Sequence, residues 1–93
     1  MSHVTRTVGT VTTTVRFYAA ARAAAGTDTT TVDVPEGATV KDLLDTLRAA
    51  HDAEFARVLL RCSYLLDEVA VRDLSTPVPA GATLDVLPPF AGG

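Results

Sequence analysis

Residues 39–50 read TVKDLLDTLRAA, and this stretch is the strongest structural signal in the 93-residue chain. Its apolar residues recur at helical spacing and form a single stripe made of Val40, Leu43, Leu44, Leu47 and Ala50. Thr39 stands before the stripe as a helix N-cap, and Asp42 follows three residues later to complete a capping box. The stretch therefore predicts one amphipathic helix whose apolar stripe packs on a sheet.

Two strand-like segments precede this helix. β-branched and aromatic residues fill positions 13–18 (TTVRFY) and 29–34 (TTTVDV), which is typical of strands. Between them, residues 19–25 and the closing Gly26 are expected to form a wide connection, so that the two strands pair as an antiparallel hairpin. A turn at 35–37 (PEG) ends the second strand.

After the main helix, a short helical segment is expected over residues 53–60, and three more strands follow it. These strands are expected at 63–66 (SYLL), 69–71 and 83–87 (TLDVL). Asp67-Glu68 would be the turn between the first two, and a proline-containing loop over 74–80 would lead to the last. The resulting order, β-β-α-β-β-β, predicts an α+β fold with a sheet packed on one main helix.

The length of the chain allows one small domain with a single core. We expect a flexible N-terminal tail over residues 1–12, a folded domain over 13–87 and a protruding C-terminal tail over 88–93. The helix stripe should pack on a set of strand residues that alternation places on one face. These residues are Val15, Phe17, Val32, Leu84 and Val86.

Composition argues against several classes of function. The net charge is −3, from 8 basic and 11 acidic residues, so a nucleic-acid partner is not expected. No apolar run approaches the roughly 20 residues that cross a bilayer, and no secretory signal opens the chain, so we expect a cytoplasmic protein with no membrane partner. Cys62 is the only cysteine, which excludes an internal disulfide and a cysteine-based zinc site. With only two histidines, neither a metal site nor a catalytic constellation is expected.

The C-terminus, residues 87–93 (LPPFAGG), carries the chemistry. Pro88 and Pro89 end the strand and stiffen the base of the tail, because proline favours extended polyproline backbone. Gly92 and Gly93 lack a Cβ and can therefore enter a narrow channel in another protein. The Gly93 carboxylate is a poor acyl donor, but its acyl-adenylate would be open to attack by a sulfur or nitrogen nucleophile.

Together these features resemble the ubiquitin-like β-grasp sulfur carriers of the MoaD/ThiS family, from about residue 13 to 93. The resemblance rests on Phe17-Tyr18-Ala19 with Arg22 and Gly26, on the helix at 39–47, and on the segment from Gly81 to the C-terminus. The Pro-Pro-x-x-Gly-Gly ending is more similar to the small subunits of molybdopterin synthase than to the thiamin sulfur carriers. The chain departs from the family pattern at Asp67-Glu68, where Asn-Gly is expected, and in its longer N-terminal extension.

The resemblance implies a carrier that has no bound cofactor and is not an enzyme by itself. An ATP-dependent activating enzyme would adenylate Gly93, and a sulfur donor would convert it to a thiocarboxylate. The tail would then enter the large subunit of molybdopterin synthase and deliver sulfur to a cyclic pyranopterin. Alternatives are sulfur delivery toward cysteine, thiamin or another metabolite, a protein modifier that joins Gly93 to lysines, and a binding module with an inert tail.

Several residues have two interpretations each. Pro88, Pro89, Phe90, Ala91 and Gly92 would thread into the partner with Gly93, although Phe90 could equally be a loose hydrophobe. Tyr18 and Leu87 have the strand parity opposite to Phe17 and Val86. They would either form a docking patch together with Phe90 or seal the edge of the sheet. Cys62 is expected to be a small buried hydrophobe, with a sulfur relay as the alternative.

Overall fold

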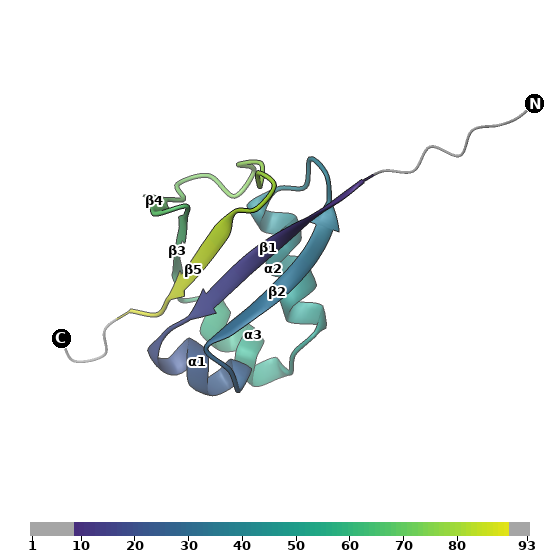
Figure 1. Cartoon of the computed structure of the whole chain (residues 1–93). Coiled ribbons are helices and arrows are strands. Elements are labelled where there is room, and N and C mark those ends of the chain that lie inside the picture. The colour runs from purple at the N-terminus through teal and green to yellow at the C-terminus, as the bar shows by residue number, and fades with distance from the viewer. Residues whose placement is uncertain (1–8, 90–93) are drawn as a thin grey trace, which may run out of the picture.

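The computed structural model describes residues 9–89, in which helices cover one face of a five-stranded sheet and leave the other face open (Figure 1). The elements follow in the order β1 (Thr10–Phe17), α1 (Ala19–Ala25), β2 (Thr29–Pro35), α2 (Val40–Ala49), α3 (Ala53–Leu59), β3 (Ser63–Leu66), β4 (Val69–Ala70) and β5 (Thr83–Leu87). None of the helices in this described part of the chain is long and apolar enough to span a membrane. The α+β prediction is confirmed.

The sheet is mixed, with the strand order β2-β1-β5-β3-β4. The β1–β2, β5–β3 and β3–β4 pairs are antiparallel, whereas the first and last strands, β1 and β5, lie side by side and run parallel. In this central pair Val15 lies opposite Leu84, and Phe17 lies opposite Val86. Pairing of the first and last strands at the centre of the sheet is the arrangement expected of a β-grasp fold.

The core lies between the sheet and the helices, much as the sequence predicts. The stripe of α2 is buried at Val40, Leu43, Leu44 and Leu47, and so are the predicted strand residues Val15, Phe17, Leu84 and Val86. One prediction is wrong, because Ala50 is the exposed C-cap of α2. Val32 is half-buried and packs against this core, and Val34 on the same strand is buried in it.

Helix α2 begins as its sequence predicts. The Thr39 hydroxyl accepts a hydrogen bond from the Asp42 N–H at 3.2 Å, and the Asp42 carboxylate accepts one from the Thr39 N–H at 3.0 Å. Both N–H groups would otherwise lack an intrahelical partner, and a capping side chain of this kind stabilises a helix by about 1 kcal/mol. The capping box therefore sets the register that turns the apolar stripe of α2 toward the sheet.

Residues 19–25 form helix α1, so the predicted wide connection is wrong. Six of these seven residues are alanine, which has the highest helix propensity, and the buried Ala21 anchors the helix to the core. Gly26 ends the helix with φ of 79°, a left-handed conformation that glycine adopts without a Cβ penalty. The two strands on either side still pair as the predicted antiparallel hairpin.

The N-terminal boundary of the domain also differs from the prediction. Strand β1 begins at Thr10, so residues 10–12 belong to the sheet instead of the tail. They pair with β2, where Thr10 lies opposite Pro35 and Thr12 opposite Asp33. Their β-branched side chains favour an extended strand once β2 supplies the hydrogen-bonding partner. Gly9 precedes the strand, and residues 1–8 of the predicted tail lie outside the described residues.

The turn between β3 and β4 falls at Asp67-Glu68, as predicted. Both residues have positive φ, 48° and 70°, which is the conformation of a type I′ hairpin turn that usually contains Asn-Gly. Two contacts with β5 hold this unusual pair: the Asp67 N–H donates to the Thr83 carbonyl at 2.8 Å, and the Asp67 carboxylate accepts from the Thr83 N–H at 2.9 Å. The returning strand β4 ends at Ala70, one residue earlier than predicted.

Candidate functional site

The candidate site is the point where β5 leaves the sheet and the C-terminal tail begins. β5 lies between β1 and β3, so its last residues have a paired neighbour on each side. Leu87 lies opposite Ser63 of β3, and the Val86 carbonyl accepts a hydrogen bond from the Tyr18 N–H at 3.3 Å. The position and direction of the chain at Leu87 are therefore set by three strands.

Two prolines follow this anchored strand. Pro88 is half-buried and Pro89 is exposed, and neither has an N–H with which to extend the β5 ladder. The two prolines thus follow β5 at the edge of the domain, and their stiffening of the tail stays a prediction. The predicted threading residues Phe90, Ala91 and Gly92, and the predicted reacting residue Gly93, lie outside the described residues.

A buried carboxylate reinforces the anchor. Asp85, only 5% exposed, lies opposite Arg16 on the parallel neighbour β1. Arg16 Nε donates to Asp85 Oδ1 at 2.6 Å, and Arg16 Nη2 donates to Oδ2 at 3.0 Å. The hydrogen bond and negative charge of Asp85 raise the pKa of the Arg16 guanidinium above its usual range. This bidentate pair joins β5 to β1 two residues before the strand ends.

Sequence reasoning missed this pair. Alternation with Val15 and Phe17 puts Arg16 on the face away from the core, but it names no partner, because the partner lies 69 residues further along the chain. The available signal was the lone acid in 83–87 (TLDVL), an otherwise apolar strand. A charge at the centre of such a strand requires a partner when it is buried.

The proposed docking residues Tyr18 and Leu87 lie close together at this end of the sheet. Tyr18 is 40% exposed, and Leu87, one residue beyond the carbonyl that Tyr18 binds, is half-buried. Phe90, the third docking residue, lies outside the described residues. These placements agree with a docking patch without testing it.

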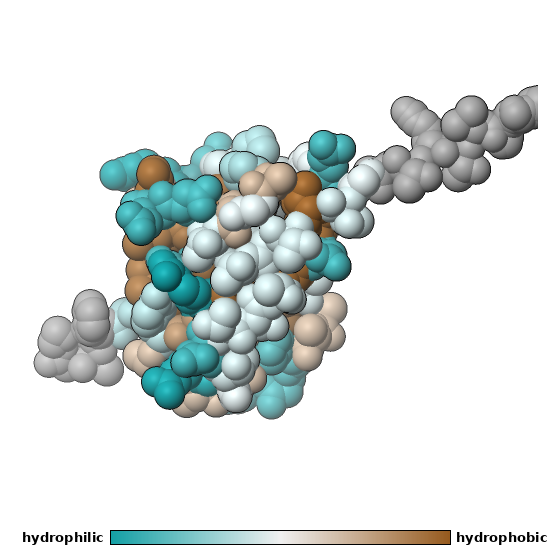
Figure 2. Space-filling model, in the orientation of Figure 1, coloured by the Kyte–Doolittle hydropathy of each residue, from teal (hydrophilic) through white to brown (hydrophobic). Residues whose placement is uncertain are grey.

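The rest of the open face is mostly polar. Alternation along β1 and β2 places several threonines there, among them Thr12, Thr14, Thr29 and Thr31. Figure 2 shows this face as mostly white and teal over β1 and β2, with brown apolar surface at the side where β3 and β4 lie and a smaller brown area on the opposite side. The centre of this face therefore offers mainly polar groups to a partner.

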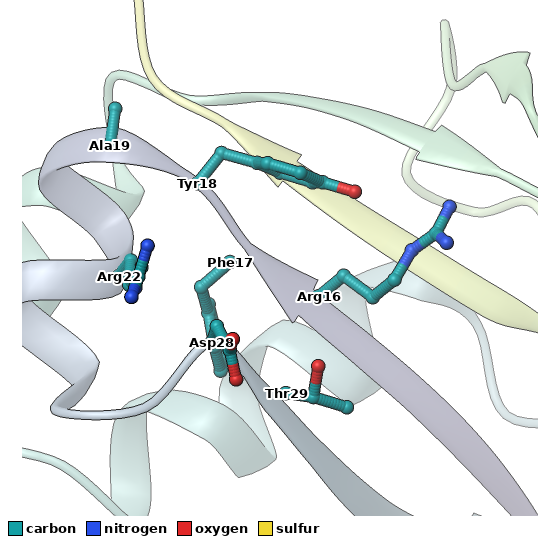
Figure 3. Close-up of a pocket in the computed structure, with 7 residues that line it drawn as sticks. All are labelled: Arg16, Phe17, Tyr18, Ala19, Arg22, Asp28 and Thr29. Carbon is teal, nitrogen blue, oxygen red and sulfur yellow. The ribbon is translucent and has the colours of Figure 1, made fainter.

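A hollow of about 280 Å³ lies beside Tyr18, where β1 passes into α1. Its lining residues are Arg16, Phe17, Tyr18, Ala19, Arg22, Asp28 and Thr29. In Figure 3 the Tyr18 hydroxyl extends toward the Arg16 guanidinium, while Arg22 projects from α1 on the other side. Ala19 has φ of 51°, which is uncommon for a residue with a Cβ. The residues at 17–19 and 22 that carried the family resemblance thus gather at one place.

Cys62 and His51 have structural contacts. The Cys62 Sγ donates to the Val58 carbonyl at 3.2 Å, and partial burial raises the pKa of this thiol to about 11. His51 Nδ1 lies 2.9 Å from the Leu47 carbonyl, and its ring stacks on Phe55 with centroids 4.2 Å apart. Among residues 9–89, no group of three or more His, Cys, Asp or Glu side chains could hold a metal ion.

Comparison with known proteins places this arrangement in a family. The model of the ThiS family matches residues 15–93. The crystal structure of SAMP1 from Haloferax volcanii is similar with a TM-score of 0.78 and 32% identity, covering 88% of this chain and 99% of that one. No curated protein sequence matches the chain.

Two further structures share the fold at lower identity. A putative molybdopterin converting factor subunit 1 from Pyrococcus furiosus has a TM-score of 0.77 and 24% identity, over 86% of this chain and 99% of that one. Subunit 1 in a complex of molybdopterin-converting factor subunits 1 and 2 from Helicobacter pylori has a TM-score of 0.68 and 22% identity, over 89% and 100%. Because the family model matches most of its length and the β-grasp fold is shared, this chain belongs to the ThiS family of small ubiquitin-like carrier proteins.

Proposed function

We propose that this chain is a sulfur carrier whose Gly93 carboxylate becomes a thiocarboxylate, and that it delivers this sulfur for molybdopterin synthesis. The observation that carries the proposal is the anchored exit of the C-terminus. The two neighbouring strands, β1 and β3, and the Arg16–Asp85 ion pair hold β5, and Pro88 and Pro89 follow at the edge of the domain. A carrier needs such a base, because a partner can position the terminal carboxyl only if the stem does not slide.

The chemistry requires two steps on the carboxyl carbon of Gly93. In the first, the carboxylate oxygen attacks the α-phosphate of ATP on an activating enzyme, which forms an acyl-adenylate and releases pyrophosphate. In the second, a hydrosulfide from a sulfur donor attacks the acyl carbon, forming the C–S bond as the C–O bond to AMP breaks. This chain contributes the carboxyl, while the partners contribute the nucleotide site and the sulfur.

The molybdopterin branch is supported by the proline pair and by the structural relatives. The fold is shared with a putative molybdopterin converting factor subunit 1 and with subunit 1 of a two-subunit converting factor. We therefore expect a large synthase subunit as the partner that accepts the charged tail. Sulfur would pass from the thiocarboxylate to a cyclic pyranopterin held by that subunit.

The experiment is a reconstitution read by intact mass. The purified chain is incubated with its activating enzyme, ATP and a sulfur donor, and exchange of one oxygen for sulfur adds about 16 Da. A Cys62→Ser variant should gain the same mass, because the sulfur resides on Gly93. Adding the large subunit and a cyclic pyranopterin should return the original mass and yield the dithiolene product, with two charged chains consumed for each dithiolene because each carries one sulfur atom. A chain that gains no mass, or that gains it only when Cys62 is present, would contradict the proposal.

A second candidate is a protein modifier. It is favoured by the 32% identity to SAMP1, whose full name is small archaeal modifier protein 1. Here a lysine amine, instead of sulfur, would attack the activated Gly93 carbonyl and form an isopeptide bond with loss of AMP. The two candidates differ in their products. Adducts with other proteins that survive a thiol reductant would support the modifier, provided that chymotrypsin, which cleaves after Phe90, leaves an Ala-Gly-Gly remnant on lysine.

A further inference from the structure

A second hollow lies at the base of the tail, on the side of helices α1 and α3, and shares no lining residue with the hollow beside Tyr18. Its lining residues are Ala20 of α1, Val58 of α3, Arg61, Pro88 and Pro89, and its volume is about 190 Å³. Helices α1 and α3 lie side by side, and a further hollow that shares Ala20 and Val58 continues between them. The stem of the tail thus forms one wall of a groove that the two helices continue.

The chemistry of this hollow is apolar with one basic group. Four of its five lining residues are alanine, valine or proline, which offer no side-chain hydrogen bonds. The fifth is Arg61, whose guanidinium has no carboxylate within ion-pair distance among residues 9–89. By contrast, the neighbouring Arg57 pairs with Glu54. The hollow therefore suits an occupant that combines an apolar side chain with a negative charge.

The four residues that follow Pro89 have this combination in the required order. Phe90 directly follows a residue of the hollow wall and supplies an aromatic ring. Ala91 and Gly92 add little bulk, and Gly93 ends in a carboxylate. Four extended residues span up to about 14 Å, and the glycines permit the chain to turn within that length.

We propose that in the free protein the tail docks on its own domain, with the Phe90 ring against Ala20 and Val58 and the Gly93 carboxylate beside Arg61. This inference rests on the proposed function only in assigning the tail as the reactive segment. The groups facing the carboxylate would be Arg61 and Arg57, with Glu54 beyond them. A partner would then have to lift the tail from the groove before it could reach Gly93.

The first test compares methyl NMR spectra of the full chain and of a chain that ends at Pro89. An aromatic ring over a methyl group moves its resonance upfield, so Val58 and Ala20 should resonate further upfield in the full chain. A Phe90→Leu variant should move both resonances to the positions of the truncated chain, while the methyls of Leu84, buried under the sheet, stay unchanged. Identical Val58 and Ala20 resonances in the full and truncated chains would overturn the proposal.

The second test follows the Gly93 carboxyl by carbon NMR across a pH titration. Pairing with Arg61 favours the ionised form, so Arg61→Gln should raise the pKa of the Gly93 carboxyl. The matched control is Arg72→Gln, which removes an exposed arginine that does not line the hollow. Equal titration of both variants and the parent would contradict the pairing.

Neither measurement uses an activating enzyme, so failure of the docking and failure of the proposed function are distinguishable. Thiocarboxylate formation with no methyl shift would reject the docked tail alone. A methyl shift without any gain of mass in the reconstitution would reject the carrier function alone.

Discussion

Arg16 and Asp85 form a two-point ion pair between the parallel strands β1 and β5, with nitrogen–oxygen distances of 2.6 and 3.0 Å. The pair is asymmetric: the Asp85 side chain is 8% exposed, whereas that of Arg16 is 43% exposed. Solvent can therefore replace the partner of Arg16 but not that of Asp85. Because the buried Asp85 depends on Arg16 for its hydrogen bonds, the pair stabilises the register of β5 against β1 just before the tail.

The two halves of this pair should respond differently to substitution. Arg16→Met leaves the buried Asp85 carboxylate without its donors, and an unpaired buried group costs about 1–3 kcal/mol, or more when charged. In the Asp85→Asn variant, water can still solvate the exposed Arg16 guanidinium. The free energy of unfolding of this variant should therefore fall by less than that of Arg16→Met. Urea denaturation of both variants measures the difference, and a larger loss for Asp85→Asn would contradict the assignment.

The apolar stripe of α2 should contribute strongly to the stability of the domain. Leu44→Ala and Leu47→Ala each remove a side chain at most 2% exposed, and such cavities cost about 2–5 kcal/mol, a serious loss for a domain this small. Chemical denaturation measures the change. Ala49→Ser, at an exposed position on the same helix, is the control and should have little effect.

The exposed Tyr18 side chain, at the base of the tail, should contribute to partner binding. Tyr18→Glu places a charge at an exposed position beside the tail base and should weaken association with the activating enzyme, measured by calorimetry, without lowering the melting temperature. Thr31→Glu, also exposed but on the edge strand β2, is the matched control. Equal affinities of the two variants would remove Tyr18 from the interface.

Cys62 should be slow to react near neutral pH. With a pKa of about 11, roughly one thiol in a thousand is ionised at about pH 8, against about a quarter in an unfolded chain. Iodoacetamide should therefore modify the folded protein far more slowly than the protein in denaturant, as mass spectrometry over time would reveal. Because folding raises this pKa, the neutral thiol favours the folded state below about pH 9, and this contribution is lost as the pH rises to about 11.

The length of the tail should be critical for transfer. Deleting Gly93 withdraws the carboxyl by about 3.3–3.6 Å, and adding an alanine after it displaces the carboxyl and introduces a Cβ. Both changes should abolish the gain of sulfur mass while leaving the denaturation midpoint unchanged, because the last strand of the sheet, β5, ends at Leu87. Persistent transfer in the Gly93 deletion would show that another carboxyl reacts.

The sequence by itself determined the local elements whose signals lie within a few residues of one another. The capping box of Thr39 and Asp42 and the stripe from Val40 to Leu47 act over one or two turns of helix, and both are present as predicted. The strand over 83–87 also has the predicted bounds. The Pro-Pro stem and the terminal glycines are likewise covalent features of the chain. Their chemistry can be argued without a fold.

The tertiary structure alone decided what depends on residues far apart in the chain. The pairing of β1 with β5 brings Arg16 to Asp85 across 69 positions, and no local pattern encodes that contact. The same applies to α1, where alanine is compatible with loop or helix until Ala21 packs in the core. It also applies to the groove formed by α1, α3 and the prolines. Local propensities contribute only small free-energy differences between conformations. The burial of side chains between distant segments contributes more and therefore decides which of the locally allowed conformations forms.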